Sequence, residues 1–241
     1  MRKSIAAAVI AASAATAACG RMHDSAGGPT VSRNFQVGNF QEIEAAGPYD
    51  IIVETGSNPS VSARGPQKVL DNIEVEVSGD KLSIHSRNHG FFNFGWGSRG
   101  RTIFTVTVPS IRAATLAGSG DLSVNNVTGD SFTGTLAGSG DLSIATVNVK
   151  SLKVSLAGSG DAKIAGGQAE SAEYDTVGSG DIDARGVTAQ QLKVSIAGSG
   201  DIGAHATGTA DVTIMGSGDV EVTGGARCTT TKHGSGDIHC S

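Results

Sequence analysis

Gly118-Ser119-Gly120-Asp121 is the first of seven copies of the tetrapeptide that decides the fold of this chain. The copies begin at Gly118, Gly138, Gly158, Gly178, Gly198, Gly216 and Gly234. Successive copies are 20 residues apart as far as Gly198, and the last two intervals are 18 residues. A fixed period of this length over half of the chain predicts one short supersecondary unit that is stacked on itself.

Alternating apolar and polar residues flank each copy. Leu152–Leu156 precedes the third copy, and Leu122–Val124 follows the first. Alternation with a period of two predicts strands with one buried face, and the glycines between them allow sharp turns. Two or three short strands with their turns use about 20 residues. The sequence therefore predicts an all-β fold, a parallel β-solenoid whose coils are about 20 residues long.

Stacked coils place equivalent residues above one another. The predicted core columns contain Phe132, Leu152 and Leu192 in one, and Leu116, Leu136, Leu156 and Ile196 in another. Gly134 and Tyr174 fall in the column of Val154 and Val194, so the interior is predicted to be uneven.

The first 19 residues have the pattern of a targeting segment. Arg2 and Lys3 form a positive start, and the Ala-rich stretch that follows is too short to be a membrane helix. Thr16-Ala17-Ala18-Cys19-Gly20 resembles a bacterial lipobox, in which the cysteine becomes the diacylated N-terminus, although Thr16 departs from its usual Leu or Val. The alternative is ordinary cleavage that leaves Cys19 as a free thiol. Residues 20–34 are predicted to be a flexible tether, and Gly20 favours the outer membrane as the destination.

Two cysteines remain if Cys19 is acylated. Cys228 and Cys240 lie on either side of the last tetrapeptide, and in an oxidising compartment a disulfide between them is predicted to staple the terminal coil. His233 and His239 lie nearby, so a metal site there is the alternative.

Residues 35–109 alternate like strands but lack the tetrapeptide. They are predicted to form an N-terminal β cap with partly antiparallel strands, because an uncapped solenoid end would expose an unpaired strand edge. One short helical turn is predicted within Gln67 to Asn72. Residues 110–241 are predicted to be the solenoid.

Several motifs in this half resemble the head GIN domain family of putative auto-transporter adhesins. They are Phe40-Gln41-Glu42-Ile43, Gly47-Pro48-Tyr49-Asp50-Ile51-Ile52-Val53, Leu82-Ser83-Ile84 and Val106-Thr107-Val108-Pro109, followed by the Gly-Ser-Gly-Asp copies. The resemblance covers about residues 35–238. It implies a right-handed β-solenoid on a cell-envelope protein or lipoprotein, and it brings no catalytic residues with it.

The aspartates of the tetrapeptides are predicted to form a ladder. They are Asp121, Asp141, Asp161, Asp181, Asp201, Asp219 and Asp237. Neighbouring carboxylates about 5 Å apart repel by roughly 1 kcal/mol in water-like surroundings. We expect side chains that accept backbone N–H groups at the turns, with a structural role and no bound metal or cofactor. A row of Ca²⁺ ions bridging successive carboxylates is the alternative.

Phe91, Phe92, Phe94 and Trp96 lie together among glycines, between two predicted strands. An exposed aromatic patch is typical of contacts with a partner, a glycan or a membrane, so these residues are the candidate binding site. The alternatives are that they fold down as a plug over the end of the solenoid or that they are disordered.

These features favour a non-enzymatic, adhesin-like or scaffolding lipoprotein of the cell envelope, in the outer membrane or the periplasm. The expected partner is an envelope polymer, a glycan or a protein, with membrane contact through the lipid anchor alone and homo-oligomerisation left open. A net charge of −5 without a basic block argues against nucleic acid. The alternative is a carbohydrate-active enzyme, a polysaccharide lyase or hydrolase, whose carboxylates would come from the aspartate ladder with Asp183 and Glu221 nearby.

Overall fold

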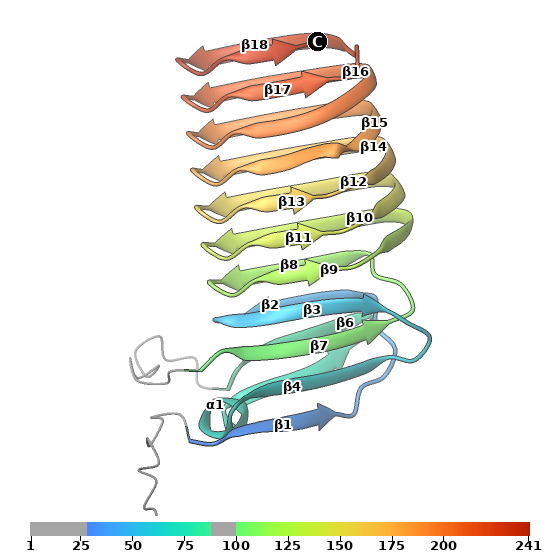
Figure 1. Cartoon of the computed structure of the whole chain (residues 1–241), viewed down its shortest axis with the longest axis vertical. Coiled ribbons are helices and arrows are strands. Elements are labelled where there is room, and N and C mark those ends of the chain that lie inside the picture. Colours follow the sequence, from blue (N-terminus) through green and yellow to red (C-terminus); the bar gives the residue numbers. More distant parts are fainter. Residues whose placement is uncertain (1–27, 88–99) are drawn as a thin grey trace, which may run out of the picture.

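The computed structural model describes residues 28–87 and 100–241, and within them the chain is a β-solenoid (Figure 1). The N-terminal elements are β1 (Thr30–Phe35), β2 (Glu42–Ala46), β3 (Tyr49–Thr55), β4 (Ser60–Pro66), α1 (Gln67–Asp71), β5 (Ile73–Ser78), β6 (Lys81–Ser86) and β7 (Thr102–Val108). No helix in the described ranges has the length and apolar character needed to cross a bilayer.

The repeat region alternates long and short strands. The strands are β8 (Ala113–Gly118), β9 (Leu122–Val124), β10 (Val127–Gly138), β11 (Leu142–Ile144), β12 (Val147–Gly158), β13 (Ala162–Ile164), β14 (Gly167–Gly178), β15 (Ile182–Gly198), β16 (Ile202–Gly216), β17 (Val220–Thr223), β18 (Arg227–Gly234) and β19 (Ile238–Cys240). In β15 and β16 the short strand continues into the long one without a break.

Successive coils pair in parallel and in register. Leu136 pairs with Leu156, and Gly138 pairs with Gly158, because the sequence period equals the length of one coil. The predicted columns are confirmed: Phe132, Leu152, Ala172 and Leu192 follow one another, and Tyr174 lies between Val154 and Val194. All of them are buried.

The buried Tyr174 lies in a coil with small neighbours. Ala162 stands where the adjacent coils have Leu142 and Ile182, and Ala172 stands where they have Leu152 and Leu192. We infer that these two alanines provide the volume that the phenol ring fills, because protein interiors are close-packed.

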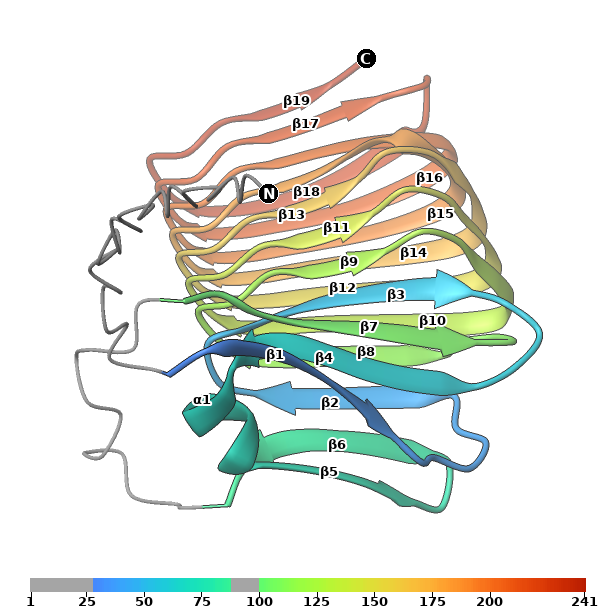
Figure 2. The same ribbon diagram turned by 60° about the horizontal axis from the view of Figure 1, so that its bottom comes forward.

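The N-terminal half combines two arrangements (Figure 2). The β1–β4, β4–β7 and β5–β6 pairs are antiparallel. Strands β2 and β3 instead pair in parallel with β8 and β9, so they form a coil directly below the first tetrapeptide. The predicted helical turn is α1, which begins after Pro66 and buries Leu70.

Candidate functional site

The Gly-Ser-Gly-Asp corners stack so closely that their glycines are required. Gly138 has a φ of +142°, a conformation that side chains with a Cβ rarely adopt. A Cβ on Gly140 would clash with the carbonyl oxygen of Gly120 in the preceding coil. In the same corner, the Ser139 N–H donates to the Gly118 carbonyl over 3.0 Å. The glycines therefore allow adjacent backbones to hydrogen-bond at the corner.

The aspartates form the predicted ladder, but they bond between coils rather than within their own turn. The Asp161 N–H donates to Asp141 Oδ1 over 3.0 Å, and the Asp181 N–H donates to Asp161 Oδ1 over 3.0 Å. The same bond joins every consecutive pair from Asp121 to Asp237, with lengths of 2.7–3.2 Å. The carboxylates from Asp121 to Asp219 thus each bind the backbone of the next coil, which favours a structural role.

The ladder has a first member that sequence reasoning missed. Asp50 Oδ1 accepts the Asp121 N–H over 3.3 Å, and Arg101 binds Asp50 Oδ2 over 2.8 Å. Gly47-Pro48-Tyr49-Asp50 has its glycine and aspartate at the same spacing as the tetrapeptide, and Gly47 also has a positive φ, of +143°. That spacing is the signal that could have identified the corner.

The described residues hold no evident metal centre. Within residues 28–87 and 100–241, no group of three or more His, Cys, Asp or Glu residues could hold an ion. His233 and His239 are both exposed, on β18 and β19.

A groove runs along one side of the solenoid, across strands β10, β12, β14, β15, β16 and β18. Its outward side chains come from one column, in register from coil to coil. They are Thr133, Lys153, Glu173, Lys193, Asp211 and Thr229, and Ser151, Ser171, Gln191, Thr209 and Arg227 complete the polar lining. Hydroxyl, amide and charged groups therefore repeat along the groove at the spacing of parallel strands, about 4.8 Å.

Charges alternate at the centre of this groove. Glu173 binds Lys193 over 3.0 Å and Lys153 over 3.3 Å, and Lys153 also binds Asp175 over 3.1 Å. The hydrogen bond from Lys193 lowers the pKa of Glu173, and the hydrogen bond to Asp175 raises the pKa of Lys153. At the centre of the groove the charges are therefore paired with one another along and across the strands.

Asp183 and Glu221, the two carboxylates near the ladder in the enzymatic alternative, are bridged by one guanidinium. Arg185 donates to Asp183 Oδ1 over 3.1 Å and to Glu221 Oε2 over 2.9 Å and 3.0 Å, and it lies against Gly203. A glycosidase pair needs two carboxyl groups in contrasting environments, one of which holds a proton. Here both carboxylates share the same cation, an arrangement that favours a structural clamp.

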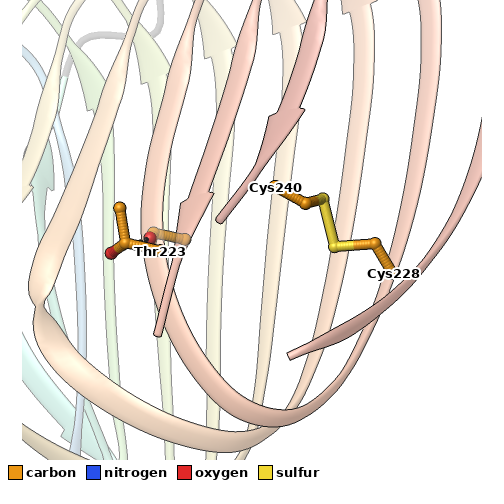
Figure 3. The surroundings of a disulfide bond; sticks show 4 residues. Thr223, Cys228 and Cys240 are labelled. Atoms are coloured by element: carbon orange, nitrogen blue, oxygen red, sulfur yellow. Dashed lines mark hydrogen bonds between the residues drawn. A yellow bond between two sulfur atoms is a disulfide. The ribbon is translucent and has the colours of Figure 1, made fainter. Parts of the chain in front are cut away.

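Cys228 and Cys240 are joined by a disulfide with a Cα–Cα distance of 6.6 Å (Figure 3). The other predicted site residues, Cys19 and the aromatic group of Phe91, Phe92, Phe94 and Trp96, lie outside the described residues.

Comparison with known proteins gives a consistent result. A family model described as "putative auto-transporter adhesin, head GIN domain" matches residues 39–226. A solved structure of a putative adhesin from Bacteroides fragilis has 26% identity and a TM-score of 0.77, with 88% of this chain and 97% of the other covered.

Two structures from Parabacteroides distasonis share the fold. One, described as a putative lipid binding protein, has 24% identity and a TM-score of 0.69, with 89% of this chain and 97% of that one covered. The other, a putative adhesin, has 20% identity and a TM-score of 0.66, with 89% and 98% covered. No curated protein matches the sequence.

Proposed function

Because the chain belongs to the putative auto-transporter adhesin, head GIN domain family, we propose that it is a non-enzymatic binding module of the cell envelope. It contacts an envelope polymer, a glycan or a protein through the side of its solenoid. The observation that carries this proposal is the groove across six strands, in which polar side chains repeat from coil to coil. Such an array suits an extended, repetitive ligand, because one kind of contact can be made at each coil.

The proposed anchor is a lipid on Cys19, which would hold the solenoid at the membrane while its sides remain accessible. If so, the Cys19→Ser variant should move from the membrane fraction to the soluble fraction of the cell. A variant that stays with the membrane would contradict the anchor and leave the binding proposal standing.

The groove is tested by a pair of variants in one coil. Glu173→Lys places three cations side by side at the centre of the groove. Glu170→Lys makes the same change in charge on the same strand, at a position that lines a separate hollow with Asn148 and Gln168. We expect Glu173→Lys to weaken binding at least about tenfold, a change of about 1.4 kcal/mol, and Glu170→Lys to leave it unchanged.

The probes are peptidoglycan, a panel of purified neutral and acidic polysaccharides, and vesicles of phosphatidylethanolamine and phosphatidylglycerol. If both variants bind equally well to every polymer that the wild type binds, the groove is excluded as the binding site. If the protein binds only to the vesicles, the ligand is a lipid and not a polymer. One relative from Parabacteroides distasonis is described as a putative lipid binding protein. Both variants should melt within a few degrees of the wild type, because exposed ion pairs contribute about 0–1 kcal/mol.

A further inference from the structure

The last coil differs from the others at its inward-facing positions. Lys232 pairs with Ile214 and so continues the column of Leu116, Leu136, Leu156, Thr176 and Ile196. Every earlier member of that column is at most 1% exposed. Thr230 likewise continues the column of Val212 and Val194. These two columns, which are apolar in the earlier coils except at Thr176, therefore end in a hydroxyl and an ammonium group.

A covalent bond closes the same end. Cys228 lies above Ala210 on the long-strand side, and Cys240 lies above Val222 on the short-strand side. Their disulfide joins the two sides of the last coil across the end of the core (Figure 3). It fixes strands β18 and β19 relative to each other.

The aspartate ladder also ends here. Asp237 donates its N–H to Asp219, but among the described residues there is no further coil to donate an N–H to its carboxylate. The ammonium of Lys232 lies 3.5 Å from Asp237 Oδ1 instead. Within the described chain β18 pairs with β16 and β19 pairs with β17, so each has one outer edge without a partner strand.

Such an edge is a template for another copy of the chain. The two ends of the molecule are unlike, because β1, β4, β5 and α1 occupy the N-terminal end (Figure 2). Two C-terminal ends, by contrast, can meet about a two-fold axis, with β18 antiparallel to its counterpart. This contact would take the Lys232 ammonium out of water above Ile214, together with its exposed partner Asp237, and the cost of desolvating such a pair can exceed the attraction between its charges.

We propose that Lys232, with the disulfide behind it, is an anti-association cap that prevents a second copy from docking on the C-terminal end of the solenoid. An inward-pointing charge at a sheet edge is one of the devices by which β proteins avoid edge-to-edge pairing. The cap is independent of the proposed binding groove, which lies on the side of the molecule.

The test restores the column. Lys232→Ile places in the last coil the same residue that Ile214 provides one coil below. Lys163→Ile, the control, makes the same change on the outward face of the short strand β13. Sedimentation velocity over a hundredfold concentration range should show a monomer–dimer equilibrium for Lys232→Ile. The dimer should dissociate at a concentration at least about tenfold lower than any dimer of the wild type or of Lys163→Ile. Lys232→Arg should behave as the wild type.

Hydrogen exchange locates the contact. In the Lys232→Ile dimer, the amides of β18 should exchange at least about tenfold more slowly than in its monomer. The cap is refuted if Lys232→Ile and Lys163→Ile have the same mass distribution, if the dimer leaves β18 unprotected, or if the wild type already dimerises with β18 protected. If Lys232→Ile does not fold, Lys232→Thr, which copies Thr176 of the same column, is measured against Lys163→Thr with the same criteria.

Discussion

At the scale of single residues, each aspartate of the ladder makes a stabilising hydrogen bond and also repels the carboxylates of the adjacent coils. Two substitutions of Asp161 distinguish these two contributions to stability. Asp161→Ala removes the acceptor of the Asp181 N–H, whereas Asp161→Asn keeps an oxygen in its place. We expect the alanine variant to lose about 1 kcal/mol of unfolding free energy. The asparagine variant should be as stable as the wild type or more stable, because the repulsion it relieves is also about 1 kcal/mol.

Denaturant unfolding at two salt concentrations measures the contributions of the hydrogen bond and of the charge repulsion. At about 1 M salt the Debye length falls to about 3 Å, so any advantage of Asp161→Asn should disappear while the loss in Asp161→Ala persists. An asparagine variant as unstable as the alanine variant would show that the negative charge itself holds the coils together.

Tyr174 is a second residue that makes one favourable and one unfavourable contribution to stability. Its ring is buried, but its hydroxyl is among the buried polar groups without a hydrogen-bond partner in the described structure. Tyr174→Phe should therefore be neutral or stabilising, whereas Tyr174→Ala should cost about 3–5 kcal/mol through the cavity it leaves. Thermal and denaturant unfolding of the two variants measure the difference.

The same residue predicts a dependence on alkaline pH. Burial raises the pKa of the Tyr174 phenol, so the folded state favours the neutral form. Its contribution to stability is complete below the unfolded pKa of about 10 and is lost as the pH rises above that value. Wild type should lose stability faster than Tyr174→Phe in this range. Parallel curves for the two proteins would mean that Tyr174 ionises alike in the folded and unfolded states, because water reaches its hydroxyl in solution.

At the scale of elements, the repeated corners and strands could be predicted, because each follows from a local pattern that recurs. Period-two alternation gave the strands, glycine pairs gave the corners, and the equal spacing gave the register that stacks Leu136 under Leu156. The disulfide partners followed from their places on either side of the last corner. These features depend on residues that are close in the sequence or one period apart.

The features that escaped prediction depend on a break in the pattern. Asp50 belongs to a corner in which Pro48 and Tyr49 replace Ser and Gly, so the sequence keeps only the Gly-to-Asp spacing, and the close approach of Gly118 to Gly47 establishes the corner. Arg185 reaches Glu221 across Gly203, a contact between three coils that no single period contains. In the sequence Lys232 resembles an ordinary surface lysine, and its register with Ile214 is what places it in a core column. Irregular residues in a regular fold are thus the ones whose roles the structure must supply.

At the scale of the whole molecule, the solenoid is a stack in which each coil contacts its neighbours, so its length should be adjustable by whole coils. Deletion of residues 135–154 removes 20 residues, one full period, and joins Gly134 to Ser155. The new junction keeps the alternation of inward and outward residues, and it places Phe132 of one coil beside Ala172 of the next. We expect a cooperatively folded protein whose unfolding exposes less surface, with a proportionally smaller denaturant m-value.

Deletion of residues 135–153, one residue shorter, is the matched control. It joins Gly134 to Val154, so Val154 and Leu156 turn outward and Ser155 turns inward. A shift of one residue moves every side chain of a strand to the opposite face, and this variant should fail to fold or should loop out a residue at a large cost in stability. Circular dichroism and denaturant titration compare the stability of the two deletion variants. Because the variants differ by a single valine, a difference in stability reports the effect of register. Equal stability of both would mean that the coils do not depend on the stacked columns, and the lateral groove would lose the rigid spacing on which its proposed role depends.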